Sequence, residues 1–271
     1  MKDIRKVINI IRSHPVLEGA GVKLNRVFSN ENVELLDPFL LLDHFGSKNV
    51  EDYIKGFPWH PHRGIETVTY MLDGKVEHGD SLGNNDLIKP GEVQWMTAGS
   101  GIIHQEMPKP IYGNMEGFQL WVNLPKNKKM TKPRYMPINN LIKTKKDDAE
   151  IKIISGEINN KKGLAKDIFV NVDYFDVVLD GKFSYNTEKE TVFIYLYNGE
   201  ITVKGKKIAK NTCAVLDRKG KITVEGKGKF ILVAGNPLRE PIAWGGPIVM
   251  NTEQELNLAF EEIRDGSFIK N

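Results

Sequence analysis

The sequence has almost no cysteine, since Cys213 is the only one among 271 residues. A single cysteine excludes an intramolecular disulfide and any zinc site built from several thiolates. Long apolar runs are also missing, and no stretch approaches the roughly 18 apolar residues that cross a bilayer. The opening residues 1–15 contain no apolar core followed by a small-residue cleavage motif. We therefore expect no signal peptide and a cytoplasmic protein.

A strong charge imbalance is absent as well. The formal net charge is +3, with 27% charged residues. This balance gives no reason to expect direct binding to nucleic acid or to a membrane surface. Hydrophobic residues make up 40% of the chain, which is sufficient for one large domain or two modest ones.

Short runs of β-branched and aromatic residues recur along the chain between glycines and prolines. Seven of them read as strands: 65–72, 92–99, 117–124, 191–199, 201–205, 212–217 and 229–235. The dipeptides Asp73-Gly74, Asp180-Gly181 and Asn198-Gly199 are typical of chain reversals. Many short strands at this spacing predict an all-β fold of barrels or sandwiches.

The region 125–146 interrupts this pattern, with three prolines and eight Lys or Arg residues. A basic patch for nucleic acid is one interpretation, but a solvated linker is the commoner use of such a stretch. We therefore expect an N-terminal domain over 1–130, a linker over 131–147 and a C-terminal domain over 148–271. The two halves look like a duplicated β architecture.

A helix is expected near the end of the chain, over about 252–265. Thr252 and Glu255 have the spacing of a capping box, and Gly266 offers a stop. We expect this helix to pack on a barrel.

All six histidines lie within the first 104 residues. A duplicated fold with its imidazoles in one half should contain one working site and one structural copy. Three histidines stand apart from that site: His44 in an apolar run is expected to be structural, His78 in a turn-rich stretch is expected to be exposed, and His14 fits no cluster.

Two short motifs carry the candidate chemistry. His60 and His62 form an H-x-H, and His104 and Glu106 form an H-x-E after a glycine-rich turn. Residues two apart in an extended strand point to the same face, so each pair can project into one barrel. An H-x-H alone is commonly a packing feature, but with the second pair it favours a metal site. Imidazole and carboxylate ligands suit divalent iron, manganese, cobalt, nickel, copper or zinc.

The segments around these motifs resemble the two cupin motifs and, more narrowly, the pirin family. The similarity extends over nearly the whole chain, through 37–46, 60–74, 78–84, 90–108, 119–125 and 245–256. It implies two jelly-roll-type cupin barrels in tandem with a short C-terminal helix. It also implies one metal ion, Fe(II) first among the candidates, bound by His60, His62, His104 and Glu106.

Glu66 complicates this ligand set, because ordinary cupins take a carboxylate ligand from that position. Strand alternation would place Glu66 on the face of His60 and His62, so we expect it beside the metal ligands or as a spare ligand. The three tryptophans Trp59, Trp95 and Trp121 are expected in the core or in a pocket wall.

The resemblance implies flavonol (quercetin) 2,3-dioxygenase activity, with a small aromatic flavonol-like substrate and O2. That reaction opens the central ring and releases carbon monoxide. Glu106 is then the expected catalytic base for the flavonol hydroxyl. Two alternatives stay open: an iron-dependent regulatory pirin that binds a protein partner without enzymatic activity, and a different cupin activity such as an isomerase.

Overall fold

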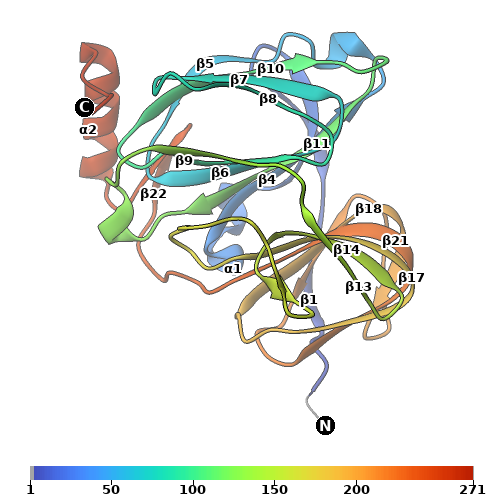
Figure 1. The fold of residues 1–271 in the computed structure, drawn as a ribbon. Helices are drawn as coiled ribbons and strands as arrows, with labels where there is room; N and C mark the ends of the chain where they lie inside the picture. The colour runs from blue at the N-terminus through green and yellow to red at the C-terminus, as the bar shows by residue number, and fades with distance from the viewer. Residues whose placement is uncertain (1–2, 271) are drawn as a thin grey trace. The chain divides into compact units, whose positions relative to one another are not determined.

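The computed structural model describes residues 3–270, and these are mostly β-strand (Figure 1). The α-helices among the described residues are α1 (Val33–Leu36) and α2 (Glu253–Asp265). Single 3-10 turns occur at Asn30–Asn32, Val50–Asp52 and Lys126–Lys128. The expected all-β class is confirmed.

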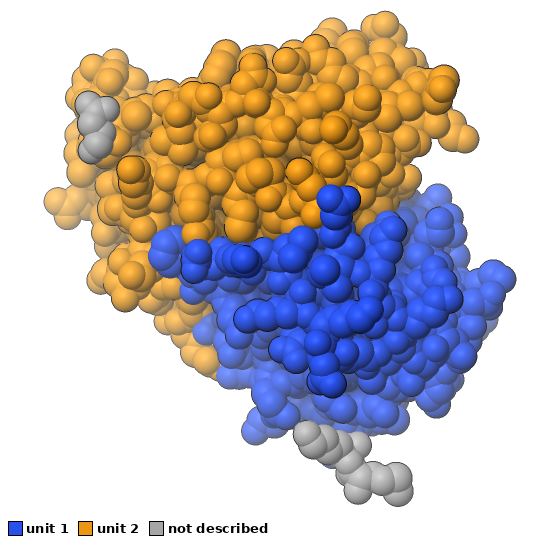
Figure 2. Space-filling model, in the orientation of Figure 1, with its two compact units in different colours: residues 1–14, 31–38, 140–237 blue, residues 15–30, 39–139, 238–271 orange. Residues whose placement is uncertain are grey.

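The chain forms two compact units, and neither is continuous in sequence (Figure 2). Unit 1 comprises residues 1–14, 31–38 and 140–237, and unit 2 comprises residues 15–30, 39–139 and 238–271. The expected division into 1–130, 131–147 and 148–271 is therefore corrected at both ends of the chain. The reason is strand pairing: β1 (Val7–Arg12) pairs with β20 (Thr212–Leu216), so the first strand completes the later unit.

The expected linker over 131–147 also needs correction, because most of it is strand. In unit 2, β12 (Arg134–Ile138) pairs with β9 (Val93–Thr97). In unit 1, β13 (Ile142–Lys146) pairs with β14 (Ala149–Ser155). The backbone hydrogen bonds of this basic stretch thus belong to two sheets, and only a short connection remains between them.

Unit 2 contains two antiparallel sheets and a C-terminal segment. The larger sheet has seven strands in the order β12-β9-β6-β11-β4-β3-β2. Its remaining members are β2 (His14–Glu18), β3 (Val22–Phe28), β4 (Phe39–Ser47), β6 (Ile65–Asp73) and β11 (Met115–Asn123). The smaller sheet, in the order β5-β10-β7-β8, consists of β5 (Phe57–His62), β10 (Ile102–Lys109), β7 (Lys75–Asp80) and β8 (Asn85–Ile88). The C-terminal segment adds the hairpin of β22 (Ala243–Gly245) and β23 (Ile248–Met250), followed by α2.

Unit 1 contains one eight-stranded antiparallel sheet and a small two-stranded one. The strand order of the large sheet is β1-β20-β18-β21-β17-β14-β13, and β19 pairs with β18 at its side. The members not yet defined are β17 (Asp173–Asn186), β18 (Thr191–Val203), β19 (Lys206–Ile208) and β21 (Lys221–Gly235). The small sheet pairs β15 (Glu157–Ile158) with β16 (Lys161–Lys162). Aliphatic and aromatic side chains fill the core of unit 1, among them Phe175, Phe183, Val192, Leu196 and Phe230.

All seven expected strand runs overlap strands of the structure, but two of the three expected reversals are wrong. Asp73-Gly74 does separate β6 from β7. In contrast, Asp180-Gly181 and Asn198-Gly199 lie inside the long strands β17 and β18. Gly181 is directly opposite Gly226 in the register, and glycine in a strand marks a bend or a close backbone approach. The long strands therefore continue where the dipeptides indicate a turn.

The C-terminal helix α2 coincides with the expected range. Thr252 accepts a hydrogen bond from the Glu255 amide, Glu255 accepts in return from the Thr252 amide, and Gly266 closes the helix with a left-handed φ of 78°. Among the described residues, no helix has the length and apolar character required to span a membrane.

Candidate metal centre

Three histidines converge in unit 2 because β5 and β10 are neighbours in the smaller sheet. His60 is directly opposite His104 in the antiparallel register, and His62 follows two residues later on the same strand. The ring centroids of His60 and His104 are 4.3 Å apart, and those of His62 and His104 are 5.0 Å apart. One nitrogen from each of the three rings lies within 4.8 Å of the others. Among residues 3–270, these three histidines form the one group of at least three His, Cys, Asp or Glu side chains whose spacing suits a metal ion.

Hydrogen bonds fix the orientation of two of these rings. His60 Nδ1 lies 2.8 Å from the Pro58 carbonyl, and His62 Nδ1 lies 3.1 Å from the Pro247 carbonyl. A carbonyl oxygen only accepts, so both Nδ1 atoms carry the proton and donate it. The two Nε2 atoms then face each other at 3.1 Å. In neutral rings these are two lone pairs in contact, which is the arrangement that a shared cation would stabilise.

The third ring, His104, is fully buried, and neither of its nitrogens has a hydrogen-bond partner within the described chain. Burial lowers the pKa of His104 well below its ordinary value, and the neighbouring histidines lower it further. Burial, together with His60, also lowers the pKa of His62 to about 3. Both imidazoles are therefore neutral at physiological pH. An unsatisfied buried nitrogen costs roughly 1–3 kcal/mol, so these residues fit a metal ion that accepts their lone pairs.

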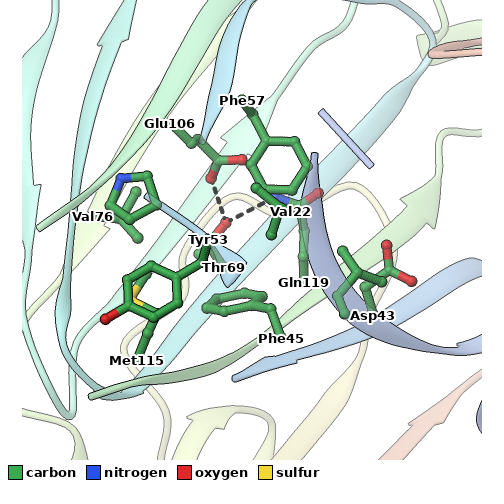
Figure 3. Close-up of a pocket in the computed structure, with 12 residues that line it drawn as sticks. Val22, Asp43, Phe45, Tyr53, Phe57, Thr69, Val76, Glu106, Met115 and Gln119 are labelled. Atoms are coloured by element: carbon green, nitrogen blue, oxygen red, sulfur yellow. Dashed lines mark hydrogen bonds between the residues drawn. The ribbon is translucent and has the colours of Figure 1, made fainter. Parts of the chain in front are cut away.

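Glu106, the fourth expected ligand, is not part of this close group. The register between β10 and β5 shifts between His104 and Glu106. The Glu106 carboxylate instead accepts hydrogen bonds from the Thr69 hydroxyl at 3.0 Å and from the Gln119 amide at 2.7 Å (Figure 3). Trp121 Nε1 donates to Gln119 Oε1 at 3.2 Å and thereby orients that amide. The carboxylate is buried and held in place from the opposite sheet.

The expected position of Glu66 is wrong. Gly64, with a φ of 78°, ends the alternation of β5, and a new strand begins at Ile65. Glu66 is opposite Thr97 in the register and accepts a hydrogen bond from its hydroxyl at 2.8 Å. The next residue, Thr67, is opposite Trp121, whose ring lies 5.0 Å from that of His62. Glu66 thus faces the other side of the sheet, and burial there raises its pKa.

His78 is the second correction, because it is fully buried rather than exposed. Its Nε2 lies 2.9 Å from Asp80 and its Nδ1 lies 2.9 Å from the Gln94 amide. The ring stacks on Tyr135 and lies 5.4 Å from the ring of His104. His78 packs beside the metal centre with both nitrogens occupied, which distinguishes it from the other three.

Two buried cations hold the end of β5, and the sequence patterns did not indicate them. Arg63 donates to the carbonyls of Ser100 and Phe268 and forms an ion pair with Glu262 at 2.7 Å. Lys129 Nζ donates to the Gly64 and Val249 carbonyls, each at 2.8 Å, and to the side chain of Asn123. Burial lowers the pKa of Lys129 to about 7, although three acceptors satisfy the three protons of its ammonium form. These contacts tie the histidine strand to the C-terminal segment.

A cleft of about 760 Å³ opens onto His60 and His62. Trp59, Trp121 and Trp244 line it, and the Trp121 and Trp244 rings lie 6.0 Å apart. Arg26, Glu18 and Asp43 provide polar groups elsewhere in its wall, where Arg26 is paired with both carboxylates. Ligand pockets of about 300–1,000 Å³ with aromatic walls and a few polar groups are typical of small-molecule sites.

The three tryptophans singled out in the sequence, and His44, lie in the core or in the cleft wall. Trp95 is in the core, whereas Trp59 and Trp121 are in the cleft wall. His44 is buried and structural, as expected, with its Nε2 3.2 Å from Glu116. Trp244 was not singled out by any pattern, because a lone tryptophan more than a hundred residues from the histidines gives no signal of its place.

Comparisons with known proteins agree with this architecture. The family model for pirin matches residues 21–122, and the model for the pirin C-terminal cupin domain matches residues 174–269. A Pseudomonas aeruginosa protein named "Putative quercetin 2,3-dioxygenase" is 41% identical over 98% of this chain and 99% of its own length. Human pirin is 37% identical over 98% of this chain and 94% of its own. A crystal structure of quercetin 2,3-dioxygenase from Acinetobacter baumannii superposes with a TM-score of 0.90 at 33% identity, covering 98% of this chain and 99% of that one.

Proposed function

Because this chain belongs to the pirin family, and because two of its three clustered imidazoles line an aromatic cleft, we propose that it is a metal-dependent flavonol 2,3-dioxygenase. The observation that carries this proposal is the contact between the Nε2 atoms of His60 and His62 beside the unpartnered nitrogens of His104. Two facing lone pairs repel each other unless they share a cation, and the unpartnered His104 nitrogens beside them favour a metal ion in that place.

The proposed ligands are His60, His62, His104 and Glu106, with iron(II) as the first candidate ion. Three imidazoles suit several divalent transition metals, so the donor set alone does not select iron. Glu106 would reach such an ion by exchanging one of its hydrogen bonds to Thr69 or Gln119. When bound, the metal supplies Lewis acidity and positions where substrate and O2 meet.

The side chains of the cleft account for the substrate class. Trp59, Trp121 and Trp244 offer flat apolar surfaces to a planar aromatic molecule. The cleft volume of about 760 Å³ accommodates a ligand of drug-like size. A flavonol would then present its ring hydroxyl to the histidine end of the cleft, with its other end near the polar wall around Arg26.

Glu106 is the proposed base. Its carboxylate is buried next to the histidine strand, and it accepts hydrogen bonds from Thr69 and Gln119 that fix its orientation. A carboxylate within hydrogen-bond reach of the substrate hydroxyl would take its proton and leave a phenolate. Negative charge on the flavonol then raises the electron density of the ring carbons that O2 attacks.

The test is to load the purified protein in parallel with iron, manganese, cobalt or nickel and to incubate each form with quercetin in air. Loss of the flavonol absorbance is followed together with release of carbon monoxide, and His62→Ala serves as the control. Metal-dependent turnover with carbon monoxide, absent in the control, is the expected result. Bound metal without turnover under any loading would contradict the dioxygenase proposal and favour the iron-dependent, partner-binding alternative.

A further inference from the structure

The charged side chains of the cleft wall come from one part of unit 2. They are Glu18, Arg26 and Asp43, on three neighbouring strands, β2, β3 and β4, at one edge of the larger sheet. Arg26 is directly opposite Asp43 in the register of β3 and β4, so the two side chains share one face of the sheet. The tryptophans of the wall come from β5, β11 and β22 instead. This polar end of the cleft therefore contains one cation and two carboxylates.

The guanidinium of Arg26 is engaged by both carboxylates. Its Nε donates to Asp43 Oδ1 at 3.0 Å and its Nη2 donates to Asp43 Oδ2 at 2.9 Å, which is the bidentate geometry that arginine prefers. Its Nη1 donates to Glu18 Oε1 at 2.7 Å. Each guanidinium nitrogen thus faces a carboxylate oxygen. An acidic group of a ligand would approach Arg26 beside two carboxylates that already neutralise its charge.

Glu18 is the most exposed of the three charged side chains. It is 39% exposed, against 19% for Arg26 and 9% for Asp43. One of its two carboxylate oxygens, Oε1, takes part in the contact with Arg26. An ionised carboxylate only accepts hydrogen bonds, so the group that a ligand presents to Glu18 has to be a donor. Because Glu18 is partly exposed, solvent and salt weaken its field, and we expect an effect of moderate size.

We propose that Glu18 selects the charge of the ligand end that lies at the polar end of the cleft, so that phenolic hydroxyls bind there and carboxylate or sulfonate groups are disfavoured. This inference rests on the proposed function, which places the ring hydroxyl of a flavonol near the histidines and its remote phenyl ring near Arg26. A cation at the histidine end favours a phenolate, whereas Glu18 disfavours an anion at the polar end. The substrate class is therefore hydroxylated aromatic molecules with an uncharged remote ring, rather than aromatic acids.

Calorimetric titration of the metal-loaded protein without oxygen measures this selectivity apart from turnover. The two ligands are quercetin and the same flavonol with a sulfonate on its phenyl ring. Quercetin should bind about tenfold more tightly. In Glu18→Gln, which removes the charge and keeps the shape, the ratio of the two affinities should fall by about threefold or more. Glu261→Gln is the matched control, because Glu261 is exposed on α2 and is not part of the cleft wall, so this variant should leave the ratio unchanged.

Ionic strength gives a second measurement, on the unaltered protein, that decides the question even if Glu18→Gln does not fold. At about 1 M salt the Debye length falls to roughly 3 Å, so the preference for quercetin should shrink toward that of Glu18→Gln. Thermal unfolding verifies that both variants are folded.

Equal affinities of the two ligands for the unaltered protein would overturn the inference. So would a ratio that neither Glu18→Gln nor salt changes, or the failure of both ligands to bind. Quercetin that binds with the expected preference but is not turned over by any metal form would contradict the dioxygenase proposal alone. The two proposals therefore fail separately.

Discussion

The Nε2 atoms of His60 and His62 lie 3.1 Å apart while each ring donates its other N–H to a backbone carbonyl. The two carbonyls fix both rings in the same tautomer, so neither Nε2 can act as a donor to the other unless one ring is protonated. With His104 adjacent and unpartnered, the protein brings three imidazoles together in a geometry that is unfavourable without a cation.

Metal should stabilise the fold substantially. Binding to the native state alone adds about 2.7 kcal/mol when free metal is a hundred times the dissociation constant. His62→Ala should weaken metal binding by more than the roughly 10–100-fold that loss of an outer hydrogen-bond partner costs, because it removes a ligand. Titration calorimetry and thermal unfolding with and without metal measure both effects. His14→Ala, at an exposed histidine outside the centre, should leave both unchanged.

The metal-free protein should lose stability in acid between about pH 6.5 and pH 3. The pKa of His62 falls from 6.5 to about 3 in the folded state, and that of His104 falls as well. The unfolded chain therefore binds more protons in this window, so the free energy of unfolding decreases as pH falls through it, by a few kcal/mol. Urea unfolding at pH 7 and pH 5 measures the loss. The loss of stability should be smaller in His62→Asn. An equal loss in that variant would refute the lowered pKa of His62 as its cause.

Glu106→Gln should separate metal binding from catalysis. Three imidazoles remain, and glutamine can still accept from Thr69 or Gln119, so the bound metal should stay near one equivalent. The base is removed, and general-base catalysis contributes typically 10²–10⁴-fold, so turnover of quercetin should fall by about a hundredfold or more. Metal analysis and carbon monoxide release on the same sample report the two effects. Retained turnover would exclude Glu106 as the base.

Glu66→Gln should leave metal content and turnover unchanged. The Glu66 carboxylate faces the opposite side of its sheet and is bonded to Thr97. Its pKa is raised by burial, so a neutral amide of the same shape removes a desolvation cost rather than a ligand. Loss of metal on this substitution would mean that Glu66 reaches the centre, contrary to its place in the register.

Trp244→Ala should raise the KM for the flavonol while changing kcat little. Trp244 forms part of the cleft wall, with its ring 6.0 Å from that of Trp121, and it is not one of the three grouped imidazoles. Aromatic stacking contributes about 0.5–1.5 kcal/mol beyond area burial, which corresponds to a rise in KM of roughly 2–12-fold. A matched Trp59→Ala variant separates the contribution of Trp59 to flavonol binding from that of Trp244. An equal fall in kcat would indicate that Trp244 positions the metal ligands instead.

Local sequence patterns were sufficient for the seven expected strand runs and for bringing the three histidines together. Alternation within β5 brings His60 and His62 to one side, and the glycine-rich turn before β10 returns His104 to the same place. Both features depend on neighbours within a few residues. Alternation along a strand gave the wrong face for Glu66. Gly64 turns the chain between β5 and β6, and the alternation does not continue across such a turn.

Other features of the centre depend on residues far apart in the chain. His78 is buried by Tyr135 and hydrogen-bonded by Gln94, neither of which is adjacent in sequence. Trp244, Pro247 and the partners of Arg63 come from the segment after residue 238. A single sequence contains no local signal for these contacts, and the same contacts shift the domain boundaries from those expected.

The carbonyl of Pro247 has a consequence for the order of events during synthesis. All three histidines leave the ribosome in the first half of the chain, but the acceptor for His62 Nδ1 is made 185 residues after it. Until that segment folds back, nothing fixes the His62 tautomer, and the nascent centre contains ligands without their final orientation. Metal uptake in the finished geometry is therefore an event of the completed chain, even though its ligands are among the earlier residues to be translated.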